Sequence, residues 1–553
     1  MRGTVPKGYF SSPLHRKTEL SATFAELRPN HFHSGLDMRI GLNIGEPVYA
    51  PADGFVSRIK VSPWGGGKAL YIDHPNGYRT VYMHLDDYAG EIGLWVDAYQ
   101  RARRCYAFDA CPNDTIRVKK GQLIAHAGNT GSSGGPHLHF DIRLTMNDQP
   151  INPLYFDIPY NDNIKPIIRD IKVYPAQEHS TVNGLNKAAS LCGKKGWAVG
   201  ADVSGPCYVG IYATDAAEGT PGKNGVERME LFVDDTLFCT YEVQTFLFEE
   251  TRAVNAIMDY TEYRRSGRAY VLSRVLRGNG NNFVVAKRNR GYLRFGDGKR
   301  HKLLCKVYDE KGNMATRTFY LNDKGPWRGG TDDDGAATGA IERKGTAVSY
   351  FKRNRLQYAG FEADLEEGTL YDHDLMLYAT SRCTNLVTPL HSLQPLRNPL
   401  PPHKAFRVRV MLPQEGDTSL RKSMVVVRFN GNRLAALPTT RHGLWLEARS
   451  DDFGGFGIAA DTIPPSMISV NILDGMPCQA HSTLQVKISD DLSGLETYDC
   501  YVNGDWTPAA FHGPKGTLTV KPGTALKKGN NEVRFVVSDM AGNKTTQTFT
   551  VKH

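Results

Sequence analysis

The residues best suited to chemistry are three histidines and one aspartate in the N-terminal part of the chain. His33 and Asp37 form an HxxxD pattern, and His137 and His139 form an HxH pattern much later. Residues two apart in a β-strand point to the same face, so His137 and His139 are expected side by side on one strand. A catalytic zinc ion takes three protein ligands, favours imidazole nitrogen, accepts carboxylate oxygen and keeps a fourth position for water. Two histidines and Asp37 can supply that set.

Each pattern alone has low specificity, because His31-Phe-His33 is also an HxH. Their combination is far more specific. The chain has no HExxH motif, so it offers no helical glutamate as a base, and it has neither a Walker A run nor a GxSxG motif. These patterns point to metal-dependent hydrolysis in which histidines carry the protons.

The segment GNTGSSGGPHLHFDIR (128–143) resembles the signature of the lysostaphin-like (LytM-type) zinc endopeptidases. NHFHSGLDMRIGLNIGEPVYAPADGFV (30–56) and TVYMHL (80–85) match the same family in the expected order. The resemblance covers about residues 22–155, about a quarter of the chain. It implies hydrolysis of the peptide stems or cross-links of bacterial peptidoglycan.

The resemblance also assigns roles to single residues. It implies that His33, Asp37 and His139 bind one Zn²⁺ per chain, and that His84 and His137 line the site without binding metal. These two imidazoles can take the proton of the water and stabilise the oxyanion or protonate the leaving amine, and which does which stays open.

Three further residues are candidates for contact with substrate. Gly134 and Gly135, with Gly131, can adopt positive φ and let an extended peptide approach the backbone, although an ordinary flexible turn is the alternative. Tyr82 is expected on the face of His84, where it can hydrogen-bond in the groove or simply pack. Asp141, on the face of His139, can orient an imidazole or lie in solvent.

The elements that position these residues are expected to be strands. We predict an all-β, multidomain chain whose residues 1–158 form an antiparallel β-sheet metallopeptidase domain. Asn76-Gly77 lies between two alternating stretches, which indicates a hairpin. Residues about 90–117 interrupt the pattern and are interpreted as an inserted surface loop.

An internal repeat organises the remainder of the chain. VYDEKGNMATRTFYL (307–321) resembles VSDMAGNKTTQTFTV (537–551), and the beginnings of the two units match as well. Both units resemble bacterial immunoglobulin-like β-sandwich domains. We predict the first at 159–323, with an insertion near 246–285, and the second at 461–553.

Two segments separate the repeats. A Gly/Asp/Thr-rich stretch at 324–340 is typical of a linker, and residues 341–460 form a β-rich domain of no assigned family. Within the latter, 406–412 and 424–437 have strand character, the second with an Asn-Gly turn.

The bulk properties limit the choice of function. A net charge of +9 on 553 residues is a mild excess without a long Lys/Arg block, so no nucleic-acid partner is expected. No apolar run is long enough to span a bilayer. The N-terminus lacks an apolar leader, so we expect an exported protein of the periplasm or cell envelope whose leader is absent from this chain, with a cytosolic protein as the alternative.

The nine cysteines contain no CxxC pair. A Cys105–Cys111 disulfide is plausible in an oxidising compartment, and Cys478 and Cys500 are candidate neighbours.

Three functions remain. The first is a peptidoglycan endopeptidase. The second is a catalytically silent or autoinhibited peptidoglycan-binding or regulatory protein of the same fold. The third is a structural or adhesion protein whose immunoglobulin-like domains contact protein partners.

Overall fold

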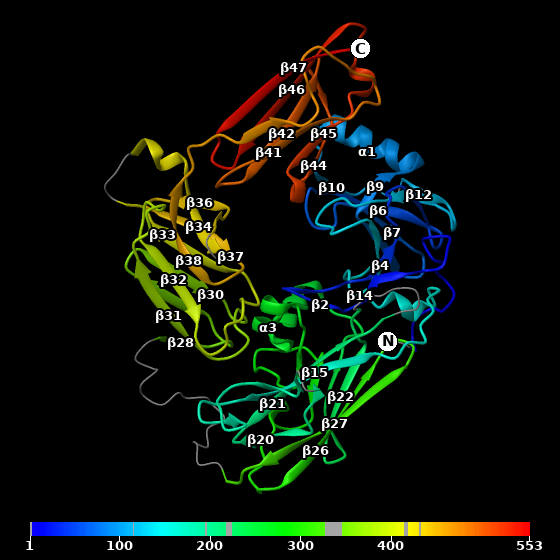
Figure 1. The fold of residues 1–553 in the computed structure, drawn as a ribbon. Helices are drawn as coiled ribbons and strands as arrows, with labels where there is room; N and C mark the ends of the chain where they lie inside the picture. The colour runs from blue at the N-terminus through cyan, green and yellow to red at the C-terminus, as the bar shows by residue number, and fades with distance from the viewer. Residues whose placement is uncertain are drawn as a thin grey trace.

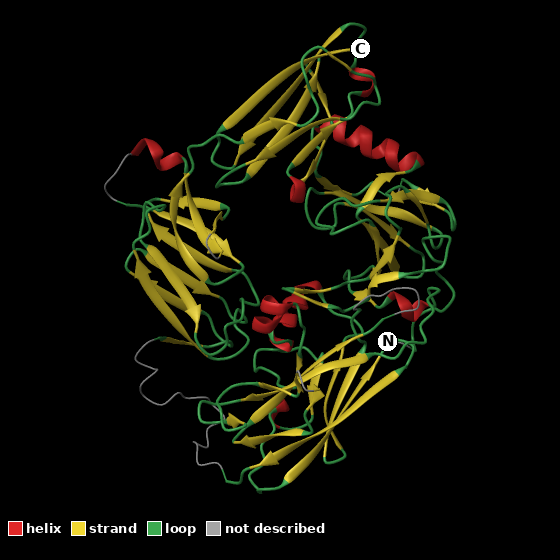
Figure 2. Ribbon diagram, in the orientation of Figure 1, coloured by secondary structure: helices red, strands yellow, loops and turns green. Residues whose placement is uncertain are grey.

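The computed structural model describes residues 3–113, 115–193, 196–216, 224–326, 345–413, 418–430 and 433–553. Strands dominate in every part of the chain (Figure 2). Four domains follow one another around a ring, so that the C-terminal domain lies beside the N-terminal one (Figure 1). The prediction of an all-β, multidomain chain is confirmed.

The N-terminal domain consists of a large antiparallel sheet and a smaller one. The large sheet has the order β1 (Leu20–Ala22), β4 (Leu36–Arg39), β13 (His137–Leu144), β8 (Tyr78–Met83), β7 (Lys68–Asp73), β6 (Gly54–Val61) and β10 (Phe108–Ala110), with β11 (Arg117–Val118) on β6 and β14 (Pro150–Ile151) on β13. The small sheet has the order β5 (Glu46–Tyr49), β12 (Leu123–Ala127) and β9 (Leu85–Tyr88). A short hairpin, β2 (Leu27–Arg28) and β3 (His31–Phe32), and the 3₁₀ helix η1 (Pro153–Phe156) complete the domain.

Alternate side chains of β13 point to opposite faces of the large sheet. Leu138, Phe140 and Ile142 are fully buried in the core of the N-terminal domain. Residues between them point to the opposite face of the sheet, which therefore carries His137 and His139. The expected hairpin at Asn76-Gly77 is also present, since β7 pairs with β8 and Gly77 has φ of 81°.

The interruption at about 90–117 is not a surface loop, and that prediction is wrong. It contains helix α1 (Gly90–Arg103) and strands β10 and β11, which extend the large sheet along β6. Ile92 and Val96 are four residues apart and buried on one side of the helix. This apolar spacing indicates a helix, whereas the loop interpretation rested on the Pro/Asp/Asn-rich stretch behind it.

The two repeated units share a core strand order and differ in their edge strands. The first pairs a sheet of β17 (Ala189–Ser190), β15 (Ile167–Pro175), β21 (Cys207–Thr214) and β24 (Val271–Leu272) with a sheet of β16 (Thr181–Val182), β20 (Gly200–Ser204), β27 (Met314–Asp323), β26 (Arg300–Tyr308), β22 (Arg228–Val233), β23 (Thr236–Glu242) and β25 (Val284–Ala286). The last pairs β39 (Ser466–Ser469), β41 (Leu484–Ser489), β45 (Thr517–Val520) and β44 (Ala509–His512) with β40 (Met476–Pro477), β47 (Lys544–Lys552), β46 (Asn530–Asp539), β42 (Leu495–Val502) and β43 (Asp505–Thr507). We call these units the first and the last sandwich.

The first sandwich contains extra short elements. They are the strand pair β18 (Cys192–Gly193) and β19 (Gly196–Trp197), the 3₁₀ helices η2 (Phe248–Ala253) and η3 (Asn289–Gly291), and the helices α2 (Val254–Ile257) and α3 (Tyr260–Ser266). The helices η2, α2 and α3 fall in the insertion expected near 246–285. The last sandwich adds η6 (Gly513–Lys515) and η7 (Gly523–Ala525).

The third domain is also built from two sheets. One has the order β28 (Thr346–Val348), β31 (Asp374–Ser381), β32 (Leu390–Pro395), β38 (Gly454–Ala460), β34 (Met424–Asn430) and β35 (Arg433–Ala436), and the other β29 (Asn354–Tyr358), β30 (Phe361–Leu365), β33 (Phe406–Met411), β37 (Trp445–Ser450) and β36 (Thr439–His442), with η5 (Thr418–Lys422) between β33 and β34. The expected strands at 406–412 and 424–437 are present. Most of the predicted linker (residues 327–340) and Gly431 of the Asn-Gly turn lie outside the described residues, and 324–326 directly follow β27.

The nine cysteines are free thiols. The Cys105–Cys111 bridge, which the sequence left open, is not formed. Cys478 and Cys500 lie in the same hydrophobic core. None of the helices in the described part of the chain is both long and apolar enough to cross a membrane.

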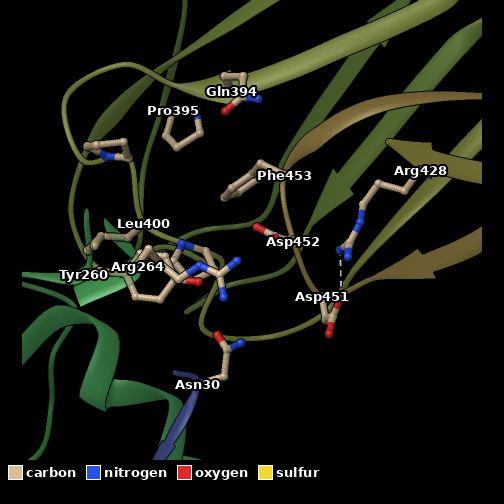
Figure 3. A pocket seen from close by; sticks show the side chains of 12 residues that line it. Asn30, Tyr260, Arg264, Gln394, Pro395, Leu400, Arg428, Asp451, Asp452 and Phe453 are labelled. Atoms are coloured by element: carbon tan, nitrogen blue, oxygen red, sulfur yellow. Dashed lines mark hydrogen bonds and ion pairs between the residues drawn. The ribbon is translucent and has the colours of Figure 1, made fainter. Parts of the chain in front are cut away.

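Two of the junctions in the ring involve residues of the N-terminal domain. At one, a pocket of about 310 Å³ lies where Asn30, helix α3 and the third domain meet (Figure 3). At the other, the Gly513 amide donates to the Pro63 carbonyl at 3.2 Å, and Trp64 lies so close that a Cβ on Gly513 would overlap its indole. The predicted metal ligands His33, Asp37 and His139 belong to neither of these contacts. They lie on or beside the large sheet of the N-terminal domain.

Candidate metal centre

Strand pairing brings the HxxxD and HxH patterns together. Strands β4 and β13 are antiparallel neighbours, and their register places Asp37 directly opposite His139. Cross-strand partners project from the same face, so the carboxylate and the imidazole meet. His33 lies just before β4 and is 2% exposed, which places it beside the pair and away from solvent.

The three predicted ligands converge on one point. His33 Nε2 and His139 Nδ1 each lie 2.9 Å from Asp37 Oδ1, and the two nitrogens are 3.0 Å apart. These three residues form one of the groups within the described residues whose ligand atoms are close enough to share an ion. The structure therefore brings together the three residues that the sequence predicts as ligands.

Hydrogen bonds on the far sides of the rings set the proton positions. His33 Nδ1 lies 2.7 Å from the Thr23 carbonyl, which can only accept, so Nδ1 carries the proton and Nε2 presents a lone pair. His139 Nε2 donates to Asp141 Oδ1 at 2.6 Å, which leaves the lone pair on Nδ1. Such outer partners orient imidazole ligands and make them more basic.

Asp141 is itself fully buried and held in place. It accepts hydrogen bonds from Ser34 Oγ at 3.1 Å and from Arg143 Nε at 2.8 Å. Burial opposes its charge, but Arg143 and His139 overcome that effect and lower the pKa of Asp141. Asp141 is therefore an ionised partner that orients His139, one of the two roles considered for it.

Charges in the site favour a cation at its centre. Burial alone would lower the pKa of His139, yet Asp141 and Asp37 outweigh it and raise that pKa to about 9. The pKa of Asp37 is well below its usual value, because the three neighbouring histidines outweigh the effect of burial. In the metal-free protein near neutral pH, a proton on His139 supplies positive charge beside Asp37, and a bound metal ion would take the place of that proton. The two nitrogens and one oxygen match the donors that Zn²⁺ prefers.

The first sandwich helps to build this site. Phe32, next to His33, is buried in the hydrophobic core of that domain, together with Phe24. Their rings lie 5.3 Å and 5.7 Å from the ring of Phe246. The Phe32 amide also donates to Thr251 Oγ1 at 2.8 Å. A ligand of the N-terminal domain is thus anchored by residues of the next domain.

Arg28, from the same hairpin, holds the other oxygen of Asp37. Its Nη2 lies 3.0 Å from Asp37 Oδ2, while Oδ1 faces the histidines. This arrangement fixes the carboxylate so that one oxygen points to the centre. Sequence reasoning did not identify Thr251 or Phe246, because nothing near the motifs signals contacts made by a distant segment. It also missed Arg28, which is close in sequence but belongs to neither motif.

His84 and His137 lie beside the centre with similar hydrogen bonds. His84 Nδ1 is 2.8 Å from the Thr130 carbonyl and His137 Nδ1 is 2.9 Å from the Gly135 carbonyl, so each presents the lone pair of Nε2. Their ring centroids are 4.6 Å apart, and His137 Nε2 is 3.4 Å from Asp37 Oδ1. Burial, with His139 and His137 nearby, lowers the pKa of His84 to about 4, so it is neutral at pH 7.

Tyr82 does not reach the site, and the suggestion that it binds in the groove is wrong. It is fully buried, packs against Phe140 and hydrogen-bonds to Thr80 Oγ1 at 2.9 Å. The prediction assumed that the strand continues through His84. His84 instead has φ of 61°, which ends the alternation and turns its imidazole toward the other histidines.

The glycine run before His137 is only partly as expected. Gly131 has φ of 72°, and a Cβ there would overlap the backbone of Gly65 and Gly67. Gly134 and Gly135 do not have positive φ, and a Cβ on either would meet open space. Their expected backbone freedom is therefore not used, although open space is compatible with an approaching substrate.

Two family models match separate parts of the chain. Residues 31–101 and 113–153 match Peptidase family M23, and residues 345–461 match the Zu5-like domain. The first match has a gap at 102–112, which begins at the end of α1 and lies within the interruption at 90–117. The second match assigns a family to the β-rich third domain.

The curated relatives match less than a third of this chain. An uncharacterized metalloprotease of Haemophilus influenzae is 33% identical over 165 residues, which are 28% of this chain and 29% of that protein. The peptidoglycan DD-endopeptidase ShyA of Vibrio cholerae is 30% identical over 167 residues, which are 29% of this chain and 33% of that protein. The matched region thus spans a third or less of either relative.

A solved structure also matches about a quarter of this chain. The catalytic domain of the antimicrobial peptidase lysostaphin from Staphylococcus simulans aligns at 26% identity with a TM-score of 0.20, covering 25% of this chain and 91% of that one. The match to Peptidase family M23 includes the five residues His33, Asp37, His84, His137 and His139.

Proposed function

Because residues 31–153 form a domain of peptidase family M23, we propose that this protein is a zinc-dependent endopeptidase that hydrolyses the peptide stems or cross-links of bacterial peptidoglycan. It would work where that polymer lies, in the periplasm or cell envelope. Its two sandwich domains, which we interpret as immunoglobulin-like, would position the peptidase domain or contact protein partners.

One observation carries the proposal. Two imidazole lone pairs and one carboxylate oxygen meet within hydrogen-bonding distance of one another, and each is fixed from behind by a further group. His84 and His137 lie beside the same point, and each is held by a hydrogen bond from Nδ1 to a backbone carbonyl. This arrangement suits a metal with an open position and two nearby proton carriers.

When bound, zinc supplies a Lewis acid that makes water acidic enough to deprotonate near neutral pH and polarises the scissile carbonyl. The chain contributes the remainder. His84, neutral at pH 7, can accept a proton at Nε2, and the Thr130 carbonyl keeps its ring in the orientation required. His137 presents Nε2 to the same space. Once protonated, either ring can stabilise an oxyanion or donate to the leaving amine.

Substrate would lie over the glycine run and beside the two accessory histidines. Ser133 Oγ donates to the Gly135 carbonyl at 2.8 Å, which holds the turn in shape while Gly134 and Gly135 leave open space above it. An extended peptide can approach such a backbone closely.

A catalytically silent relative is the alternative, but it would be expected to have lost a ligand. Here all three ligands and both accessory histidines are present. An autoinhibited enzyme is a separate form of the alternative, because the last sandwich contacts Asn129 and Trp64 near the site.

Digestion of purified peptidoglycan by the full chain tests the proposal. The protein should release fragments whose masses identify one broken amide bond, lose this activity with a chelator and regain it with Zn²⁺. If the zinc-loaded protein releases nothing, the hydrolase proposal fails for the intact chain. Binding to peptidoglycan without release would then support the silent or autoinhibited form.

A further inference from the structure

The two sandwiches contain matching clusters of buried aspartates. One consists of Asp162, Asp215 and Asp309 and the other of Asp461, Asp490 and Asp539, and in each the ligand atoms lie within 4.8 Å of one another. The first member precedes the sandwich, the second follows one sheet strand (β21 or β41), and the third ends the β26 or β46 segment of the other sheet. Each cluster therefore joins the entry of its sandwich to both sheets.

The repeat preserves the details of the third position. Asp309 accepts hydrogen bonds from the Asn313 amide and from Asn313 Nδ2, both at 2.8 Å. Asp539 accepts the same two bonds from Asn543, both at 2.8 Å. In each copy the asparagine also donates to the carbonyl of the first aspartate, at 3.3 Å to Asp162 and 3.2 Å to Asp461. The D-x-x-G-N sequence thus builds one arrangement twice.

Several buried polar atoms in and beside these clusters have no hydrogen-bond partner among the described residues. Asp215 is 2% exposed, and neither of its carboxylate oxygens has a hydrogen-bond partner among the described residues. Asn224 pairs directly with Asp215, so its side chain shares that face, and it is 1% exposed with both amide atoms likewise unpartnered. In the last sandwich, Asp490 Oδ1 is buried and unpartnered too.

The cost of this arrangement is electrostatic. Burial raises the pKa of Asp215 to about 8, and Asp162 and Asp309 add to that effect. The pKa of Asp490 is also raised, by burial and by the charges of Asp461 and Asp539. A cation bound between the carboxylates would remove both effects at once, because it supplies the charge and the contacts that the oxygens lack.

We propose that each sandwich binds one divalent cation of the calcium class, held by Asp162, Asp215 and Asp309 in the first and by Asp461, Asp490 and Asp539 in the last. The donors are oxygens alone, which favours a hard cation over zinc. Calcium–oxygen distances of about 2.3–2.6 Å allow two ligand oxygens to lie as far apart as those observed, and calcium tolerates irregular geometry better than magnesium does. Asn224 supplies a further carbonyl oxygen in the first site.

Calcium titration of the full chain tests this proposal. The protein is first freed of calcium and given one equivalent of Zn²⁺, so that the histidine site is filled. Calorimetry with CaCl₂ should then find two sites per chain. Asp215→Asn and Asp490→Asn should each leave one site, the double variant none, and the exposed Asp505→Asn control two. Two sites in the double variant, or none in the parent, would overturn the assignment.

Thermal unfolding separates a lost site from a damaged fold. Without calcium, Asp215→Asn should melt no lower than the parent, because it removes a repelled charge and keeps the shape. With calcium well above its dissociation constant, the melting temperature of the parent should rise by roughly 5–10 °C and that of the double variant should not. An equal rise in both proteins would show that calcium acts elsewhere.

Discussion

The two sandwiches share a core strand order but meet the peptidase domain in different ways. The first buries Phe24 and Phe32 in its own hydrophobic core and so anchors the segment that carries His33. The last touches the rim of the site, where His512 Nε2 lies 3.3 Å from the Asn129 carbonyl. The contrast teaches that a repeated scaffold acquires its role from what is inserted into it, since Phe246 and Thr251 belong to the insertion of the first copy.

Removing the ring of Phe246, which packs against Phe24 and Phe32, should have the largest effect on the metal site. Phe246→Ala leaves a cavity beside Phe24 and Phe32, and such changes cost about 3–5 kcal/mol of stability. Because the cavity also frees His33, zinc affinity should fall about 10–100-fold, the range for lost supporting contacts of a ligand. Competition with a chromophoric chelator measures the affinity.

Phe535→Ala is the matched control for that variant, since Phe535 is fully buried in the core of the last sandwich. It should destabilise its own domain to a similar extent and leave zinc affinity unchanged. Equal losses of zinc affinity in both variants would mean that general destabilisation, and not anchorage of His33, sets the metal site.

Within the peptidase domain, the stability of the metal-free protein should depend on pH because of His139. The folded pKa of His139 is raised to about 9 from 6.5. Its stabilising effect is therefore complete below about pH 6.5 and is lost as the pH rises through about 9, a change on the order of 3 kcal/mol. Denaturant unfolding of the chelated protein at several pH values measures it.

Asp141→Asn provides the control for that titration, because Asp141 is the nearest charge that raises the pKa of His139. The pH-dependent loss should shrink in this variant. An unchanged loss would assign the effect to another group.

A single hydrogen bond from the insertion should have a smaller effect. Thr251→Ala removes the acceptor of the Phe32 amide and should cost about 1–3 kcal/mol, because it leaves a buried donor unpaired. Zinc affinity should fall several-fold, less than in Phe246→Ala. A Thr251→Ser variant keeps the hydroxyl and should restore most of the affinity, which excludes a purely steric explanation.

The smallest effect is expected at the closing contact of the ring. His512→Ala removes two long hydrogen bonds, one to the Asn129 carbonyl and one from the Lys515 amide, and should change stability by less than about 1 kcal/mol, with zinc affinity unaltered. Peptidoglycan hydrolysis by this variant and the parent should agree within about twofold. A large increase in hydrolysis would instead indicate that the last sandwich restrains the enzyme.

The sequence was sufficient to single out the three candidate ligands, because each of the two patterns is short and the family resemblance links them. His33 and Asp37 are four residues apart, and strand alternation alone places His137 and His139 on one face. The repeated turn at Asp309 and Asp539 was likewise readable, because identical hydrogen bonds require similar sequences.

What could not be predicted depends on distant contacts or on backbone conformation. Phe246 lies more than two hundred residues after Phe32, and no local pattern links them. Tyr82 was misplaced because the left-handed conformation of His84 interrupts an otherwise regular strand. The helix at 90–103 was missed because a polar, turn-rich stretch follows it closely.

The most direct test of the central claim is to measure zinc content and peptidoglycan hydrolysis together in two variants of one strand. His139→Ala should lose both the stoichiometric zinc and the activity, since it removes a ligand. His137→Ala should retain about one zinc per chain while hydrolysis falls by about 10²–10⁴-fold, the contribution typical of a proton carrier. Full activity in His139→Ala, or loss of zinc in His137→Ala, would contradict the assignment of these roles.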